Sequence, residues 1–142
     1  MPWVKPSRAI TREEIMGDIS KHFSRHEFRC KCSNNCGFEA VDIELIKILE
    51  KVRAHFGEPI IVHCGCRCIQ HNRSIGSKDT SKHTKGIACD FHIKGILPDI
   101  INAYLEAIMA DWGGLGVYDT FNHIDVRSTK ARWDSRGHNG IV

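Results

Sequence analysis

The sequence contains no long uninterrupted run of apolar residues. Its longest apolar-rich region, residues 96–117, is broken by proline and by polar or charged residues, namely Pro98, Asp99, Asn102, Glu106 and Asp111. A helix that crosses a bilayer needs about 20 consecutive and mostly apolar residues. The sequence therefore predicts no membrane span and no membrane partner.

An apolar signal-peptide core and a long basic run are also lacking. In residues 1–14 the charges begin at Lys5 and continue to Glu14, which leaves no stretch long enough for such a core. We therefore expect synthesis in the cytoplasm without a signal peptide. Lys and Arg exceed Asp and Glu by 20 to 17, a formal charge of +3. That modest excess does not predict a nucleic-acid partner.

The chain of 142 residues is 42% hydrophobic and shows no internal repeat or low-complexity segment. This length suffices for one hydrophobic core but not for two typical domains, so we expect a single domain over residues 1–142. Within it we distinguish an N-terminal helix and Cys-rich loop, residues 11–41, from the core of the domain, residues 42–133.

Cysteine, in contrast, is abundant, with seven residues. They fall into two groups of three and one separate residue: Cys30, Cys32 and Cys36; Cys64, Cys66 and Cys68; and Cys89. In a chain without a secretion signal, this usage favours thiols or a metal site over a disulfide framework.

The spacing of apolar residues along the chain predicts three helices. The first covers residues 11–23, where a capping box precedes apolar side chains at helical spacing. The second covers residues 42–56, which have one apolar face and Gly57 as a stop. The third begins at Pro98 and ends near Trp112.

Four short segments predict strands. Residues 59–64 have the pattern of a buried strand, and residues 86–93 alternate in polarity. Residues 115–119 and 123–127 resemble two strands joined by a tight turn over residues 119–122. We expect the tail from Ser128 to form a closing turn and a loose end. The resulting fold class is α+β, a small antiparallel sheet with helices packed on it.

Three potential metal ligands are expected to meet at this sheet. His83 ends a long loop over residues 65–82, and a loop of that length in a compact domain is usually functional. Asp90 lies on the polar face of the next strand, and His123 opens another strand. A single such histidine is more often a surface residue. Two imidazoles and a carboxylate together, however, are zinc ligands that leave a fourth position for water, as in catalytic sites.

Around these residues the sequence resembles the zinc D-Ala-D-Ala carboxypeptidases and the related murein endopeptidases and hedgehog signalling domain. The family pattern is Ser-Gly-Tyr-Arg with a downstream Asn, then Ser-x-His, three residues and Gly-x-Ala-x-Asp, and later His-x-Asp or His-x-His. In this chain residues 64–67 are CGCR with Asn72 downstream, residues 81–90 are SKHTKGIACD, and residues 123–125 are HID. The resemblance covers about residues 24–133.

The resemblance implies a hedgehog/D-Ala-D-Ala-peptidase-like fold with its catalytic core in residues 42–133. It also implies one catalytic zinc ion, held by His83, Asp90 and His123. Arg67 matches an arginine that binds substrate in the family, and its planar guanidinium suits a peptide carboxylate or an oxyanion. The alternative for Arg67 is a surface salt bridge.

Two carboxylates are candidates for the catalytic proton carrier. Asp125 lies two residues after a predicted ligand on the same strand face, so its side chain should be close to the metal. Asp119 precedes that ligand by four residues, near the position from which several relatives supply an acidic base. We favour Asp125; the alternatives are a structural partner of Arg127 for Asp125 and a turn residue for Asp119.

The cysteines depart from the family pattern. Cys64 and Cys66 replace the usual Ser and Tyr beside Arg67, and their thiols are potential zinc ligands. Two alternatives remain for ordering the Cys-rich loop. The first is a second, structural zinc ion bound by Cys30, Cys32, Cys36 and Cys68. The second is a disulfide from the loop to Cys68.

We therefore expect a zinc-dependent peptidase of bacterial peptidoglycan, either a D,D-carboxypeptidase or an endopeptidase. The alternatives are a non-catalytic zinc-binding module of the same fold and a Cys-rich zinc domain that binds nucleic acid, for which the sequence lacks a basic face and finger-like spacing. We expect a monomer whose partner is a peptidoglycan peptide. Without a signal peptide the setting would be a phage or prophage endolysin, which reaches the cell wall through a holin or a virion.

Overall fold

A computed structural model describes residues 18–33 and 36–137 of the chain. Its elements in chain order are η2 (Arg25–Phe28), α1 (Ile43–Phe56), β1 (Ile60–Cys64), α2 (Ile69–Ser74), η3 (Lys82–Lys85), β2 (Ala88–Ile93), α3 (Pro98–Ile108), β3 (Gly114–Val117), β4 (Asn122–Asp125) and β5 (Ala131–Asp134). Within these described ranges, no helix combines the length and the apolar character that a bilayer crossing requires.

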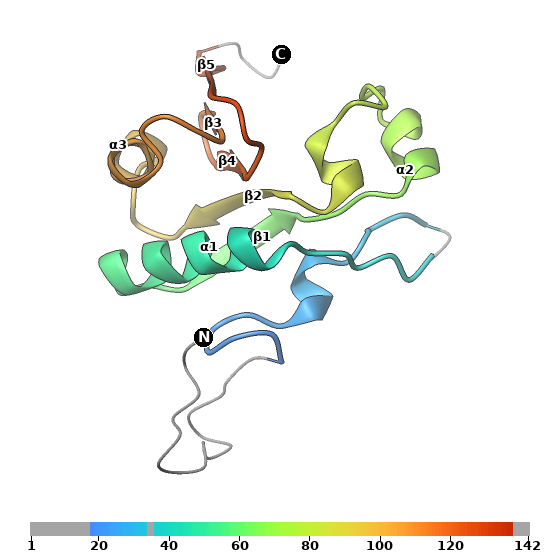
Figure 1. Cartoon of the computed structure of the whole chain (residues 1–142), viewed down its shortest axis with the longest axis horizontal. Helices are drawn as coiled ribbons and strands as arrows, with labels where there is room; N and C mark the ends of the chain where they lie inside the picture. The colour runs from blue at the N-terminus through green and yellow to red at the C-terminus, as the bar shows by residue number, and fades with distance from the viewer. Residues whose placement is uncertain (1–17, 34–35, 138–142) are drawn as a thin grey trace.

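The strands form one open sheet in the order β1-β2-β4-β3-β5. The pairs β1·β2, β2·β4 and β3·β4 are antiparallel, whereas β3·β5 is parallel. Figure 1 shows α1 running alongside β1 and β2, with α3 at the other end of the sheet. The predicted α+β fold with helices on a small, mostly antiparallel sheet is therefore confirmed.

The hydrophobic core lies between the sheet and the helices α1 and α3. The alternation predicted for β2 is confirmed, since Cys89, Phe91 and Ile93 are buried in this core. Successive side chains of a strand point to opposite faces, so Asp90 and His92 lie on the face away from the core. The polar face of β2 is thereby available for a site.

Helix α1 matches its prediction closely. Asp42 is its N-cap and accepts a hydrogen bond from the backbone N–H of Glu44. Gly57 ends the helix in the left-handed region, with φ of 72°. The third predicted helix is also present but stops at Ile108, a few residues before Trp112.

The helix predicted over residues 11–23 is wrong in its described part. Residues 11–17 lie outside the described residues, and residues 18–22 form bends. The backbone N–H groups of Ile19 and Ser20 donate to the carbonyl of Phe23, the reverse of the helical direction. Glu50 of α1 holds this segment, because its carboxylate accepts hydrogen bonds from the Ser20 hydroxyl and the His22 backbone N–H.

Replacing Glu50 with Gln is expected to lower the free energy of unfolding by about 1–3 kcal/mol at neutral pH. Burial disfavours the charged form of Glu50, but the hydrogen bonds from Ser20 and His22 outweigh it and lower the pKa of the carboxyl. The stabilisation that Glu50 provides is therefore present at pH values above the pKa of its carboxyl in the unfolded chain. It is lost as pH falls through the pKa of that carboxyl in the folded protein. Urea unfolding of both proteins at neutral and acidic pH measures the difference.

Glu58→Gln, at an exposed position just after α1, is the matched control and should change the free energy of unfolding little at either pH. A Glu50→Gln difference that grows on acidification would contradict this account of how residues 18–24 are held.

The tail prediction is wrong as well, because residues 131–134 form β5 instead of a loose end. This strand pairs in parallel with β3, from Gly114 opposite Ala131 to Val117 opposite Asp134. Arg132 secures it, since its guanidinium donates to the carbonyls of Met109 and Gly113. The predicted turn between the preceding strands is shifted by one residue, as Tyr118 N–H donates to the carbonyl of Phe121.

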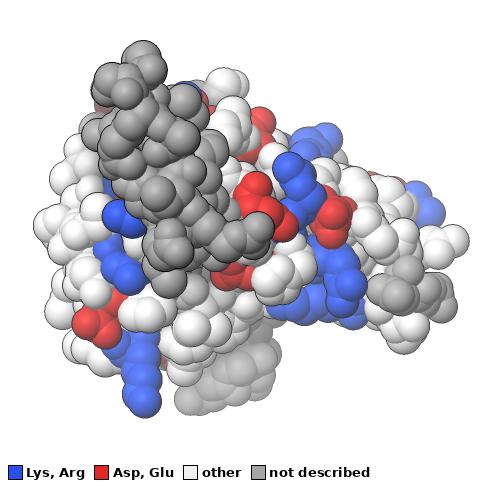
Figure 2. Space-filling view, turned by 90° about the horizontal axis from the view of Figure 1, so that it is seen from below, with Lys and Arg blue, Asp and Glu red and all other residues white. Residues whose placement is uncertain are grey.

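The surface shows no uniformly basic face where it is described and visible in Figure 2. Lys and Arg side chains stand there beside Asp and Glu side chains. This arrangement agrees with the modest net charge of +3.

Candidate functional site

The three predicted metal ligands lie together on the polar side of the sheet. Asp90 of β2 and His123 of β4 are opposite each other in the antiparallel register. His123 Nδ1 lies 2.8 Å from Asp90 Oδ1, and His83 Nε2 lies 3.4 Å from Asp90 Oδ2. The carboxylate of Asp90 thus joins the two imidazoles through its two oxygens.

The imidazole of His83 is oriented by the backbone. Its Nδ1 lies 2.6 Å from the carbonyl oxygen of Gly65, which only accepts, so Nδ1 carries the hydrogen and donates it. Nε2 then faces Asp90. Burial lowers the affinity of His83 for a proton, but Asp90 and Cys64 outweigh it and raise the pKa of His83 to about 10.

A tight turn connects the first two candidate ligands. Gly86 ends η3 with φ of 71°, a left-handed conformation that glycine adopts without strain. A Cβ at this position would also approach Ala40 too closely. This turn brings the chain from His83 into β2, so that the side chains of His83 and Asp90 meet.

His123 lies between two carboxylates. On one side it contacts Asp90, and on the other its Nε2 lies 2.8 Å from Asp125 Oδ2. Burial disfavours a charged His123, but Asp125 and Asp90 outweigh it and raise the pKa of His123. For Asp90, burial is likewise outweighed by hydrogen bonds from His123 and His83, which lower the pKa of its carboxyl.

These side chains fit a zinc ion chemically. His83 Nε2 and the carboxylate of Asp90 face each other at 3.4 Å, where either a proton or a metal ion joins them. Cys64 lies nearby, and one potential ligand atom from each of Cys64, His83 and Asp90 falls within 4.8 Å of the others. Imidazole nitrogen, carboxylate oxygen and thiolate are all zinc ligands. The potential competition by Cys64 therefore has a geometric basis.

Asp125 is fully buried, and both of its oxygens are occupied. Its Oδ1 accepts from Gly114 N–H and Arg127 Nε, and its Oδ2 contacts Arg127 Nη2 and His123 Nε2. Burial opposes ionisation, but the bonds to His123 and Arg127 outweigh it and lower the pKa of Asp125. A Cβ at Gly114 would overlap this carboxylate, which explains the glycine there.

Asp119 lies in the exposed turn before β4, where its Oδ1 accepts a hydrogen bond from Gly137 N–H. Among the described residues, neither Asp119 nor Asp125 lines the cleft that contains the three ligands. The proton-carrying role predicted for one of them stays a prediction.

This cleft has a volume of about 440 Å³, and His83, Asp90 and His123 form part of its wall. Small-molecule and peptide sites typically have volumes of about 300–1,000 Å³. Four cationic side chains also line it, namely Arg67, Lys78, Lys82 and Arg127. The cleft therefore suits a peptide-sized substrate that carries negative charge.

Arg67 lines the cleft and is largely buried, with 9% of its surface exposed. Its backbone N–H donates to the carbonyl of His83, which ties it to the ligand segment. Its Nε is buried and has no hydrogen-bond partner. Such a group is unusual in proteins, and either a buried water or a bound ligand would supply the missing acceptor. The structure shows no salt bridge for Arg67 within residues 18–33 and 36–137.

The aromatic side of the cleft was missed by the sequence interpretation. Trp133 of β5 donates from Nε1 to the hydroxyl of Tyr118, and its ring lies 4.9 Å from that of His123. A Cβ at Gly116 would overlap the Trp133 ring, so the glycine makes room for it. Gly114 and Gly116 lie two positions apart in β3 and therefore on the same face of the strand. This pair of glycines was the sequence feature that could have indicated large side chains packed against that face.

Comparison with known proteins places these residues in context. Residues 21–125 match the model of a protein family described as Peptidase M15. Peptidoglycan L,D-endopeptidase MepK from Escherichia coli K12 is 32% identical, over 75% of this chain and 60% of the relative. The MepK proteins of E. coli O157:H7 and Shigella flexneri match to the same extent. The chain thus spans about three fifths of the length of these curated relatives.

Proposed function

Because the chain belongs to the peptidase M15 family, we propose that it is a zinc-dependent peptidase that hydrolyses peptide bonds of bacterial peptidoglycan. The observation that carries this proposal is the meeting of His83, Asp90 and His123 in the wall of a cleft of about 440 Å³. The L,D-endopeptidase activity named for the relatives favours cleavage within the peptide over removal of a terminal residue. Delivery to the wall by a phage holin or virion stays a prediction.

His83, Asp90 and His123 would hold the ion. When bound, zinc supplies Lewis-acid polarisation of the scissile carbonyl and lowers the pKa of water toward neutrality. His83 contributes Nε2, because its Nδ1 is bound to the Gly65 carbonyl. His123 contributes Nδ1, because its Nε2 faces Asp125. Each imidazole therefore has one nitrogen fixed by the protein and the other directed at the shared centre.

Asp125 acts on the reaction through His123 in this proposal. Its carboxylate is buried, ionised and held by Arg127, so it fixes the orientation and tautomer of the imidazole. We therefore regard Asp125 as a positioning residue, and this differs from the proton-carrying role that its strand position suggested.

Arg67 is proposed to bind the substrate. Its buried Nε has no partner within the described chain, and its guanidinium lies in the same cleft as the ligands. A substrate carboxylate or a developing oxyanion would accept from it, and loss of one such donor typically costs about 10²–10³ in rate. Lys78 and Lys82 extend the positive wall of the cleft.

The non-catalytic zinc-binding module remains the second candidate. It is favoured by one observation, that neither Asp119 nor Asp125 lines the cleft where a proton carrier would act.

The test is digestion of purified sacculi with the zinc-loaded protein, followed by mass spectrometry of the released fragments. We expect fragments with new amino and carboxyl termini at an L,D bond, none with His83→Ala, and about 10²-fold slower release with Arg67→Ala. A zinc-loaded, folded protein that binds sacculi but releases no fragment would overturn the peptidase proposal and support the non-catalytic module.

A further inference from the structure

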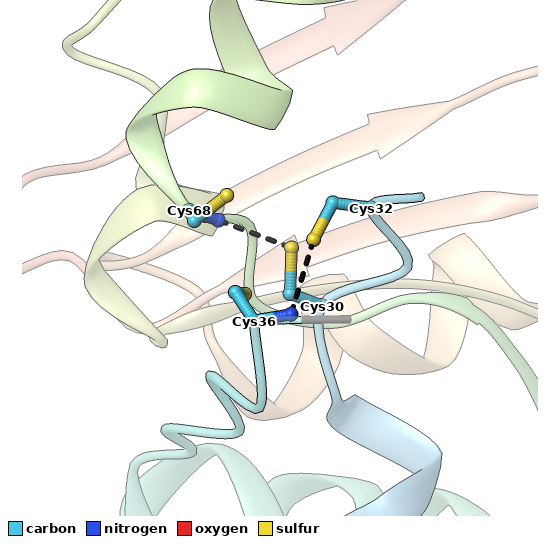
Figure 3. A group of neighbouring side chains, drawn as sticks. All are labelled: Cys30, Cys32, Cys36 and Cys68. Atoms are coloured by element: carbon cyan, nitrogen blue, oxygen red, sulfur yellow. Dashed lines mark hydrogen bonds between the residues drawn. The ribbon is translucent and has the colours of Figure 1, made fainter. Parts of the chain in front are cut away.

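Four cysteines form a cluster outside the cleft. Cys30, Cys32 and Cys36 belong to the Cys-rich loop after η2, and Cys68 is the N-cap of α2. Their four sulfur atoms all lie within 4.8 Å of one another. Figure 3 shows the side chains, which come from two separate segments, directed toward a common centre.

Each of the four sulfurs accepts one hydrogen bond from a backbone N–H. The donors are Cys68 N to Cys30 (3.3 Å), Cys36 N to Cys32 (3.4 Å), Phe38 N to Cys36 (3.4 Å) and His71 N to Cys68 (3.4 Å). These donors fix the direction of each sulfur, as outer-shell partners of metal ligands do.

The spacing of the sulfurs suits a metal ion at their centre. Zinc is bound by four thiolates in closed tetrahedral structural sites, with bonds of about 2.3 Å, which gives sulfur–sulfur edges of about 3.8 Å. Four sulfurs within 4.8 Å of one another approach that arrangement. A disulfide would use only two of them and leave the other two, with their N–H donors, facing an empty centre.

We propose that Cys30, Cys32, Cys36 and Cys68 bind a second, structural zinc ion, separate from the ion of the cleft. Zinc binds as four thiolates, and the four thiol protons pass to solvent. A cavity of about 130 Å³, lined by Cys32, Cys36, Cys68 and His71 among others, gives the ion access from solvent. The proposal does not depend on the peptidase activity.

This ion would order the segment behind the substrate-binding arginine. Residues 29–42 contain no helix or strand where they are described. The loop nevertheless runs close to residues 64–68, since the Cys66 thiol donates to the Phe38 carbonyl and Cys68 N–H donates to Cys30 Sγ. Cys68 directly follows Arg67. A metal cross-link between the loop and Cys68 would therefore fix the backbone next to Arg67.

Metal analysis of the purified, zinc-loaded protein tests this proposal. We expect two zinc ions per chain in the wild type, one in Cys32→Ser/Cys36→Ser, and one in Asp90→Asn. Cys66→Ser is the matched control, a cysteine of the same segment whose sulfur contacts the carbonyls of Phe28 and Phe38 instead of the cluster. It should keep two ions.

A second measurement needs no cysteine variant. X-ray absorption at the zinc edge of Asp90→Asn, which retains only the cluster ion, should show four sulfur neighbours at about 2.3 Å and no nitrogen or oxygen neighbours. A zinc content that is the same in the wild type and in Cys32→Ser/Cys36→Ser, or a disulfide among these four cysteines in the native protein, would overturn the proposal. If the protein holds only one ion, digestion of sacculi shows whether the peptidase proposal still stands. The two proposals can therefore fail separately.

Discussion

Asp90→Asn is expected to reduce peptidoglycan hydrolysis by roughly 10³-fold or more, equivalent to about 4 kcal/mol of transition-state stabilisation. Asp90 contacts both His83 and His123, through different oxygens. An amide in its place removes the negative charge that balances the ion and leaves the two imidazoles without their common partner. Fragment release from sacculi and zinc content of the purified variant measure the two effects.

Asp79→Asn is the matched control for this prediction. Asp79 is an exposed aspartate between α2 and η3, paired with Arg73 and not among the residues of the cleft wall. It should retain wild-type hydrolysis and metal content. If Asp90→Asn kept its cleft zinc ion and its activity, the assignment of the metal centre would be wrong. His83→Gln provides an independent loss of one ligand should Asp90→Asn fold poorly.

Asp125→Ala is expected to destabilise the fold by about 3–5 kcal/mol. This is the usual cost of removing one partner of a buried ion pair. The substitution leaves the guanidinium of Arg127 without its bidentate partner and the N–H of Gly114 without an acceptor. It also frees His123 Nε2. The midpoint and free energy of urea unfolding measure the loss.

The chain offers a close control in Asp134→Ala. Asp134 and Arg136 repeat the two-residue spacing and the bidentate geometry of Asp125 and Arg127, with Arg Nε on Oδ1 and Nη2 on Oδ2. The side chains of Asp134 and Arg136 are 52% and 43% exposed, however, whereas that of Asp125 is 0% exposed. Solvent screens the exposed pair, so its loss should change stability little. Equal destabilisation by both variants would show that burial does not decide the strength of these pairs.

Acidification should remove the stabilisation of the fold that the Asp125 carboxylate provides. Its folded pKa is lowered, so its stabilisation is complete above the unfolded pKa and is lost as pH falls through the folded pKa. The difference between wild type and Asp125→Ala should therefore shrink in strong acid. Asp125→Asn, which keeps the shape, should lose about 10–100-fold in activity if the residue positions His123. A complete loss with zinc retained would instead restore its predicted role as the proton carrier.

Much of the fold and of the site could be predicted because the relevant patterns are local. The apolar face and the Gly57 stop predicted α1, and alternation in residues 86–93 predicted both the buried face of β2 and the exposed direction of Asp90. The spacing of His83, Gly86 and Asp90 carried the resemblance to a peptidase family, and residues 21–125 match that family.

Other features depend on contacts between residues far apart in the chain. The capping box at residue 11 suggested a helix up to residue 23, but Glu50, about 30 residues away, holds residues 20 and 22 in bends. The tail had no local strand pattern, and it became β5 because β3 offered an unpaired edge for parallel pairing.

The sequence by itself determined which side chains are able to bind a metal and on which strand face they lie, because period and spacing set the direction of a side chain along its own element. Only the tertiary structure decided that Asp125 is buried behind His123 and that Trp133 forms the aromatic wall of the cleft. These relations arise from the packing of distant segments, and no local pattern of residues encodes the distance between two segments that meet only when the chain folds.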